Sequence, residues 1–253
     1  TGNNGLYRQL EEVLASFFGS ESALVFNSGY DANIGFFSAV PQRTDVVIYD
    51  ELSHASIRDG IGMGLAQSYK FKHNQLEGLS GQIDRARERK PDSDIYVVTE
   101  SVFSMDGDTP DLKALVELCI SKGAYLVVDE AHAVGVFGSR GEGLIHELGL
   151  QDKVFARIIT FGKAMGCHGA AVLGGDALKD YLVNFARSFI YTTGIPPHSL
   201  ATILAACEHL SISRGGQMQL RRNIYFFKEQ LRGHNLAAHF IPSDLAVHCC
   251  LVE

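Results

Sequence analysis

Residues 126–135 read LVVDEAHAVG, an apolar run that ends in Asp129 and is followed by His132. The nearly all-apolar run that leads into Asp129 predicts a strand that is buried on both faces of a sheet. The letters DEAH also form motif B of many nucleic-acid helicases, where they serve ATP hydrolysis. The rest of the chain decides whether Asp129 and His132 serve that chemistry or another.

The chain lacks the phosphate-binding loop that a helicase needs, which has the form GxxxxGK[ST]. Its Gly-Lys pair, Gly162-Lys163, has no glycine five residues earlier, and Ala164 follows it. The 22 Lys and Arg residues stand against 29 Asp and Glu residues, so the formal net charge is −7. Because an acidic chain without a basic run offers no footprint for phosphates, we expect no nucleic-acid partner.

Other classes of site and location are also disfavoured. GxSxG is absent, which argues against a hydrolase nucleophile, and the histidines lack zinc-ligand spacing, so we expect no metal. No apolar run reaches about 18 residues, so we expect no membrane span. The cysteines are odd in number and without zinc-ligand spacing, which favours a reducing, cytoplasmic location. They are Cys119, Cys167, Cys207, Cys249 and Cys250.

Apolar runs and helical patterns alternate along most of the chain. Predicted strands cover 22–26, 45–50, 67–71, 94–101, 124–129, 155–162, 170–175 and 245–253, and predicted helices cover 6–19, 55–66, 76–89, 110–123, 176–189, 196–210 and 217–232. This alternation predicts an α/β fold with a mostly parallel central sheet flanked by helices. We expect a large domain over residues 1–211, lacking its N-terminal part, and the truncated start of a smaller C-terminal α+β domain over 212–253.

Polar residues recur just beyond the predicted strands. They are Asp50 and His54, Glu100 and Ser104, Asp129 and His132, and Thr160 and Lys163. Because ligands bind at the carboxyl ends of parallel strands, this recurrence predicts one site built from several strand ends.

Asp129 and Lys163 together fit one kind of cofactor. A partly buried lysine can have a lowered pKa and form a Schiff base with an aldehyde. An aldehyde cofactor with a pyridine ring also needs a carboxylate that keeps its ring nitrogen protonated. Its phosphate needs backbone N–H groups at the start of a helix, and NSGYDAN (Asn27–Asn33) lies between a strand and a helix. Thr160 could add a hydroxyl.

VVDEAHAVGVFG followed by ITFGKAMGCHGAAVLG resembles the α-oxoamine synthases, which are pyridoxal-phosphate enzymes of the fold type I transferases. The segments FNSGYDAN, DELSHAS, TESVFSMDGD and FARSFIYTTGIPP occur in the family order and at similar spacing. The resemblance covers essentially the whole chain. It implies pyridoxal 5'-phosphate as cofactor, and an amino acid and an acyl-CoA or acyl-carrier thioester as substrates of an acyltransferase that releases CO2.

The resemblance also implies the roles of individual residues. Lys163 would hold the cofactor and act as base, Asp129 would pair with the ring nitrogen, and His54 would stack on the ring. His132 and Ser104 would bind the phenolic oxygen of the cofactor. Residues that would bind the cofactor phosphate are Gly29, Tyr30, Thr160, Thr192 and Thr193. In the family the segment that matches Thr192 and Thr193 reaches the neighbouring subunit, so we expect a homodimer with shared sites.

Alternatives remain open within and beyond this family. GAAVLG and FARSFIYTTGIPP favour the branch that uses L-alanine, whereas sister enzymes use glycine or serine with other acyl thioesters. A pyridoxal-phosphate aminotransferase or lyase would share the cofactor and need no thioester. A non-catalytic partner subunit would keep the fold, but such subunits typically lose the lysine that is present here as Lys163.

Overall fold

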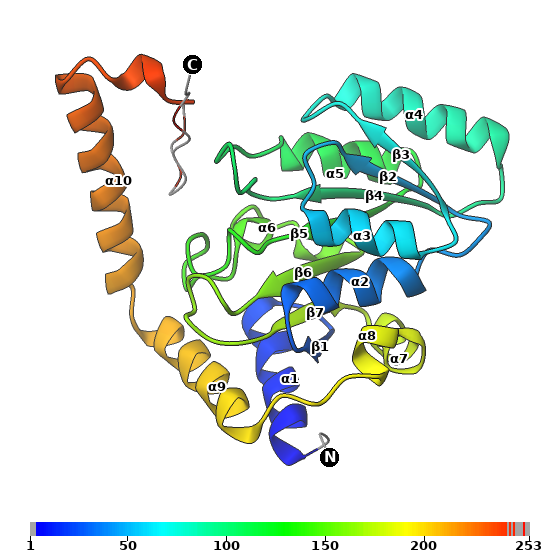
Figure 1. Cartoon of the computed structure of the whole chain (residues 1–253), viewed down its shortest axis with the longest axis horizontal. Helices are drawn as coiled ribbons and strands as arrows, with labels where there is room; N and C mark the ends of the chain where they lie inside the picture. Colours follow the sequence, from blue (N-terminus) through cyan, green and yellow to red (C-terminus); the bar gives the residue numbers. More distant parts are fainter. Residues whose placement is uncertain (1–3, 242, 244, 246–249, 251–253) are drawn as a thin grey trace.

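The computed structural model describes residues 4–241, 243, 245 and 250, and its centre is a seven-stranded sheet enclosed by helices (Figure 1). The strands are β1 (Ser22–Phe26), β2 (Val46–Asp50), β3 (Gln67–Phe71), β4 (Ile95–Glu100), β5 (Tyr125–Asp129), β6 (Ala156–Thr160) and β7 (Ala170–Gly174). Their order in the sheet is β1-β7-β6-β5-β4-β2-β3. Of these strands β7 alone runs antiparallel to its neighbours. The predicted mostly parallel α/β sheet is therefore confirmed.

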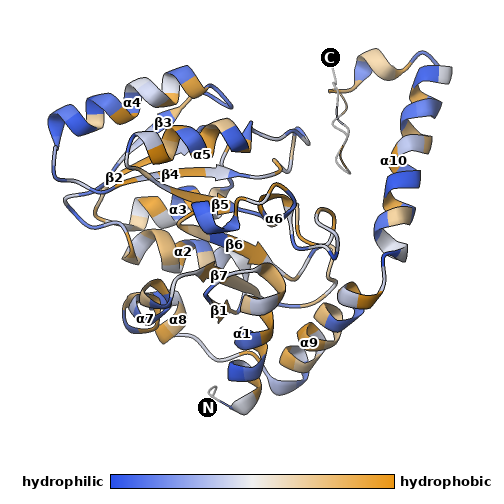
Figure 2. Ribbon diagram, turned by 180° about the vertical axis from the view of Figure 1, so that it is seen from behind, coloured by the Kyte–Doolittle hydropathy of each residue, from blue (hydrophilic) through white to orange (hydrophobic). Residues whose placement is uncertain are grey.

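Helices cover both faces of the sheet. They are α1 (Gly5–Phe18), α2 (Gly29–Ala39), α3 (Ala55–Met63), α4 (Leu76–Arg89), α5 (Leu112–Ser121), α6 (Leu144–Glu147), α7 (Asp176–Phe185), α8 (Arg187–Ile190), α9 (Pro197–Ile212) and α10 (Gly215–Gly233), with 3-10 turns at Gln151–Lys153 and Ala237–His239. Alternate residues of the strands pack against α2, α3 and α7 on one face, and against α1, α9, α4 and α5 on the other. Most residues of the inner strands are accordingly apolar and buried, whereas the edge strand β3 is largely exposed (Figure 2).

The parallel strands place their polar ends at one edge of the sheet. Asp50, Glu100, Asp129 and Thr160 are the last residues of β2, β4, β5 and β6. Each strand leads into a loop at this edge, and the first turns of α2 and α3 begin there as well. The fold thus collects the polar residues that the sequence separates, as the strand pattern predicts.

The helix predicted over 176–189 is divided in two. Ala186 has an extended backbone (φ −72°, ψ 104°), which ends α7 and lets α8 begin at Arg187. Ala186 itself is fully buried against α2 and β1. Packing of the chain against the sheet therefore overrides the helical propensity of this segment.

Helix α10 stands away from the sheet and its flanking helices (Figure 1). None of its residues is buried, and Tyr225 and Phe226 are exposed. Most of the strand predicted over 245–253 lies outside the described residues, although Cys250 forms an isolated bridge with Phe240. A separate C-terminal domain from residue 212 stays a prediction. Within the described part of the chain, every helix is too short or too polar to cross a membrane.

A buried ion pair joins the sheet to the loop after β5. Arg157, 2% exposed, binds Glu130 at 3.5 Å and donates to the carbonyl of Phe18. Glu130 also accepts the backbone N–H of Ile145 at 2.9 Å. Burial opposes the charge of both partners, raising the pKa of Glu130 and lowering that of Arg157. Removing either partner would therefore leave the other as a buried group without its counter-charge.

We expect Arg157→Leu to lower the free energy of unfolding by about 3–5 kcal/mol, because it leaves Glu130 as a buried charge without its partner. Urea denaturation followed by circular dichroism measures this change. The control is Arg8→Leu, which breaks an exposed pair with Glu12 and should change stability little. Equal effects of the two substitutions would contradict the expectation.

Candidate active site

A cavity of about 350 Å³ lies at the carboxyl edge of the sheet. This volume is in the range of small-molecule sites. Its walls come from the starts of α2 and α3 and from the ends of β4, β5 and β6. It is lined by Asn27, Ser28, Gly29, Tyr30, Asn33, His54, Ser56, Glu100, Asp129, Ala131, His132, Thr160, Gly162, Lys163, Cys167, His168 and Gly169.

Lys163 lies on the loop after β6 and donates a hydrogen bond from its Nζ to Nε2 of His132. Although the Lys163 residue is exposed through the open cavity, the cavity walls partly desolvate its ammonium group, which lowers the Lys163 pKa; Asp129 and Glu100 oppose this shift. Burial and the nearby Lys163 charge lower the pKa of His132 to about 4. His132 is therefore neutral near pH 7 and accepts the hydrogen bond from Lys163.

Two hydrogen bonds fix the carboxylate of Asp129, which is 5% exposed. Its Oδ1 accepts the backbone N–H of Ala131 at 2.9 Å, and its Oδ2 accepts Nδ2 of Asn33 at 3.0 Å. Asn33 in turn donates to Oγ of Ser56 at 3.0 Å. Because the two donors come from α2 and the loop after β5, and Ser56 of α3 fixes Asn33 in turn, the Asp129 carboxylate is held in one orientation in the cavity.

His54 caps the start of α3 and exposes its ring to the cavity. Its Nδ1 lies 2.7 Å from Oγ of Ser56 and also accepts the Ser56 backbone N–H. Its own backbone N–H donates to Oε1 of Glu100 at 2.7 Å. The two contacts with Ser56 hold the imidazole and the contact with Glu100 holds the backbone of His54 at the cavity wall, where the family resemblance predicted a ring-stacking residue.

The start of α2 forms one end of the cavity, which we call the candidate anion-binding end. Gly29 and Tyr30 are the first two residues of the helix, where backbone N–H groups have no acceptor within the helix. The Oγ1 of Thr160 is buried beside them and has no hydrogen-bond partner among the described residues. A Cβ on Gly29 would lie 2.6 Å from Cγ2 of Thr160, so the glycine allows this close approach. Unpaired donors at a helix start fit a phosphate group.

Three predicted binding residues do not line the cavity. Ser104 lies in the loop after β4, next to Phe103, which packs on the ring of His73. Thr192 and Thr193 are exposed and contact Asn27, whose Nδ2 donates to Thr192 Oγ1 at 2.8 Å and to the Thr193 carbonyl at 2.7 Å. Their predicted contacts with a cofactor stay predictions.

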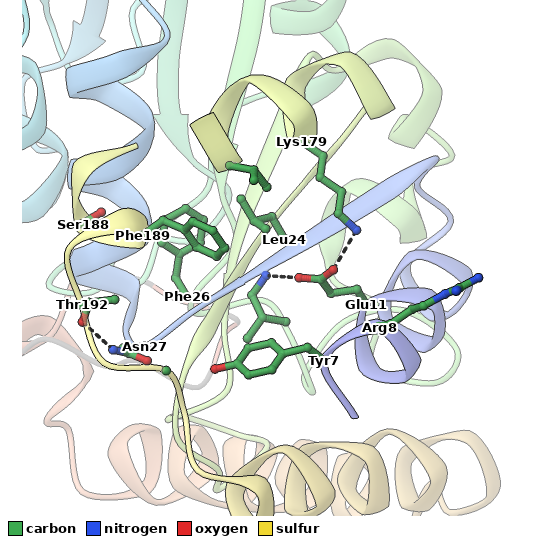
Figure 3. Close-up of a pocket in the computed structure, with 13 residues that line it drawn as sticks. Tyr7, Arg8, Glu11, Leu24, Phe26, Asn27, Lys179, Ser188, Phe189 and Thr192 are labelled. Atoms are coloured by element: carbon green, nitrogen blue, oxygen red, sulfur yellow. Dashed lines mark hydrogen bonds and ion pairs between the residues drawn. The ribbon is translucent and has the colours of Figure 1, made fainter. Parts of the chain in front are cut away.

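A second, larger cavity of about 390 Å³ adjoins the first and shares Asn27 with it (Figure 3). Leu24, Phe26 and Phe189 give it apolar walls. Its buried charge is already paired, because Glu11 accepts the Val25 N–H and binds Lys179 at 2.7 Å. The smaller cavity is the candidate active site, since it lies at the carboxyl ends of the parallel strands and gathers Lys163, His132 and Asp129.

The sequence did not single out the residues that orient the predicted ones. Asn33 and Ser56 fix Asp129 and His54, and each lies in a helix whose start the motifs already contain. A buried asparagine in the apolar pattern of α2 was the available signal, because buried amides need partners. Glu100, 4% exposed, was signalled by its place at a strand end.

The fold, the cavity and the comparisons define the class of this protein. The model of the aminotransferase class I and II family matches residues 1–240, and the chain belongs to this family. A solved serine palmitoyltransferase from S. paucimobilis superimposes with a TM-score of 0.93 and 30% identity, over 100% of this chain and 64% of that one. The fold type I architecture expected from the sequence is therefore confirmed.

Particular relatives carry one recurrent name. The 8-amino-7-oxononanoate synthase of Emericella nidulans is 43% identical over 228 residues, which are 86% of this chain and 55% of the relative. A putative 8-amino-7-oxononanoate synthase of Bacillus cereus (strain ATCC 10987 / NRS 248) is 41% identical, over 95% of this chain and 62% of the relative. The solved 8-amino-7-oxononanoate synthase of Francisella tularensis has a TM-score of 0.80 and 32% identity, over 92% and 67% of the two chains. The chain spans 55–62% of the length of these curated relatives.

Proposed function

We propose that the protein is a pyridoxal-phosphate-dependent acyltransferase that condenses L-alanine with a pimeloyl thioester. The products are 8-amino-7-oxononanoate, CO2 and the free thiol of coenzyme A or a carrier protein. The observation that carries the proposal is the convergence of Lys163, Asp129, His132 and His54 around one cavity that also has the candidate anion-binding end. The identities of 41–43% to relatives with that name support the choice of substrates.

The cavity offers partners for three polar groups of the cofactor, namely its phosphate, ring nitrogen and aldehyde. The unpaired Oγ1 of Thr160 and the first N–H groups of α2 suit the phosphate. The fixed carboxylate of Asp129 suits the ring nitrogen, and the amine of Lys163 suits the aldehyde. Pyridoxal phosphate, when bound, supplies an aldehyde for the amino acid and a protonated ring that withdraws electrons from its Cα.

The residues of the chain would position and move protons. Burial lowers the pKa of Lys163, and its Nζ would take the Cα proton once it has lost its own proton. Neutral His132 holds Nζ in place through its Nε2. Asp129, whose carboxylate two donors hold in place, would keep the proton on the ring nitrogen. His54, at the cavity wall, would cover a face of the ring.

Gly29→Ala tests the candidate anion-binding end. The added Cβ would meet Cγ2 of Thr160 at 2.6 Å, so Thr160 or the start of α2 must shift. We expect the dissociation constant for pyridoxal phosphate to rise about 10-fold, or ~1.4 kcal/mol, measured by titration of the visible absorption. Gly62→Ala is the matched control, since a Cβ there meets nothing within 4 Å. An unchanged dissociation constant for Gly29→Ala would contradict the proposal that the cofactor phosphate binds at the start of α2.

The activity itself is tested by supplying L-alanine, glycine or L-serine with pimeloyl-CoA, acetyl-CoA or palmitoyl-CoA, and by measuring CO2 and the ketone product. We expect the highest kcat/KM for L-alanine with pimeloyl-CoA. A preference for glycine or serine would assign the protein to a sister branch, of which the solved serine palmitoyltransferases are structural relatives. Turnover of an amino acid without a thioester would indicate an aminotransferase or lyase.

We also propose a cytoplasmic homodimer. Cys119, Cys167 and Cys207 are free thiols, which suits a reducing compartment. Thr192 and Thr193 are exposed and do not line the candidate active site of their own chain, so they are available to the site of a neighbouring subunit. Sedimentation of the cofactor-bound protein tests the dimer, and a monomer with full activity would exclude shared sites.

A further inference from the structure

Two carboxyl groups lie side by side at the floor of the candidate active site. Glu100 and Asp129 are register partners on the neighbouring parallel strands β4 and β5. Register partners project from the same face of a sheet, with their backbones about 4.8 Å apart. Glu100 is 4% exposed and Asp129 is 5% exposed. Two carboxylates in such a place repel each other, so one of them favours the protonated form.

The hydrogen bonds distinguish the two groups. Asp129 accepts a donor on each oxygen, from Ala131 N–H and Asn33 Nδ2. Glu100 accepts one donor, the backbone N–H of His54. Since hydrogen bonds to a carboxylate favour its charged form, the geometry leaves the charge on Asp129 and the proton on Glu100.

The other charged groups near Glu100 do not reverse this assignment. Lys163 faces it from the loop after β6, but its Nζ donates to His132. Asp50, at the end of β2, adds a further negative charge. Burial, followed by the Asp129 charge, raises the pKa of Glu100 to about 8, against the smaller opposing effects of the His54 N–H and Lys163.

We propose that Glu100 is a positioning residue that carries a proton near pH 7, holding His54 through its carboxyl oxygen while Asp129 keeps the negative charge. A neutral Glu100 also withholds a negative charge from Lys163, and an ionised Glu100 would favour the Lys163 ammonium. The proton on Glu100 therefore removes one of the two carboxylate charges that oppose the lowering of the Lys163 pKa. This consequence for catalysis rests on the proposed function, whereas the protonation of Glu100 does not.

Glu100→Gln tests the proton in the protein without added cofactor, because glutamine has the shape of the neutral acid. Between about pH 4.5 and 8 the folded protein would hold a proton that the unfolded chain has released, so the wild-type loses stability as the pH rises through this window. The variant lacks that loss. We expect the Tm of Glu100→Gln to match the wild-type at pH 5 and to exceed it by at least about 5 °C at pH 8.

The control carboxyl is Glu142, which is buried but ionised. Glu142 binds Arg140 at 2.8 Å, and hydrogen bonds with Arg140 help to lower its pKa. Its stabilising charge is present above its unfolded pKa, so Glu142→Gln should lose Tm at pH 7 and lose less near pH 4. A Glu100→Gln variant that followed this control would overturn the proposal, because it would place a charge on Glu100.

A direct spectroscopic measurement completes the test. In the infrared spectrum at pH 7, the wild-type should show the C=O stretch of a protonated carboxyl group that Glu100→Gln lacks, and its absence from the wild-type would overturn the proposal even if the variant failed to fold. Addition of pyridoxal phosphate then tests the proposed function separately. A protein that shows the Glu100 proton and binds no cofactor would keep this inference and lose the proposed function.

Discussion

Lys163→Ala is expected to abolish the visible absorption band of bound pyridoxal phosphate and to lower kcat by at least about 10³-fold. The reason is chemical, because alanine offers no amine to the aldehyde and no base for the Cα proton. We also expect that His132, the neighbour of Lys163, does not replace it as the base in this variant. Burial, the largest cause of its lowered pKa, remains in the variant and keeps the imidazole of His132 a weak base.

The matched control is another lysine beside a cavity. Lys179 lines the neighbouring, larger cavity, where it pairs with Glu11 (Figure 3). Lys179→Ala should keep the absorption band and most of the activity. If Lys179→Ala lost the band and Lys163→Ala kept it, the site would have to be moved to the larger cavity. Circular dichroism of both variants checks that the fold is unchanged.

The sequence predicts most of the fold because its strands are short apolar runs and because residues such as glycine mark the ends of its helices. Gly19, with φ 61°, ends α1 where the pattern predicted the end of the helix. Propensity fails where tertiary packing decides, as at Ala186, which is buried in an extended conformation and divides the predicted helix. The antiparallel direction of β7 is not encoded in its apolar run, because period and composition are the same for either direction.

The sequence predicted those site residues that lie at or just after the ends of strands. Asp129 and Lys163, 163 − 129 = 34 residues apart in the sequence, line the same cavity because β5 and β6 are parallel neighbours. The sequence could not show which partner each group finds. The link from Asn33 to Asp129 depends on how α2 packs against the sheet, and the placement of Glu100 beside Asp129 depends on strand register; no local pattern specifies either.

Asp129→Asn is expected to lower kcat by about 10²–10³-fold with little loss of stability. The asparagine Oδ1 can still accept the Ala131 N–H, but its Nδ2 would face Nδ2 of Asn33. Asn33 can resolve this clash by turning its amide, because its Oδ1 has no partner among the described residues, although its Nδ2 then no longer donates to Ser56. We therefore expect the fold to tolerate the change, whereas the ring nitrogen of a bound cofactor would lose the carboxylate proposed to keep it protonated.

Steady-state kinetics, thermal unfolding and the pH dependence of the cofactor absorption measure the three parts of this expectation. Asp111→Asn is the matched control, since Asp111 caps α5 by accepting Ala114 N–H and asparagine caps a helix equally well. A variant at position 129 with normal kcat would show that the ring nitrogen needs no charged partner here. If activity and Tm fell together in Asp129→Asn, the carboxylate would have a structural role. The shared cavity of Asp129 and Lys163 would then no longer support a pairing of Asp129 with the ring nitrogen.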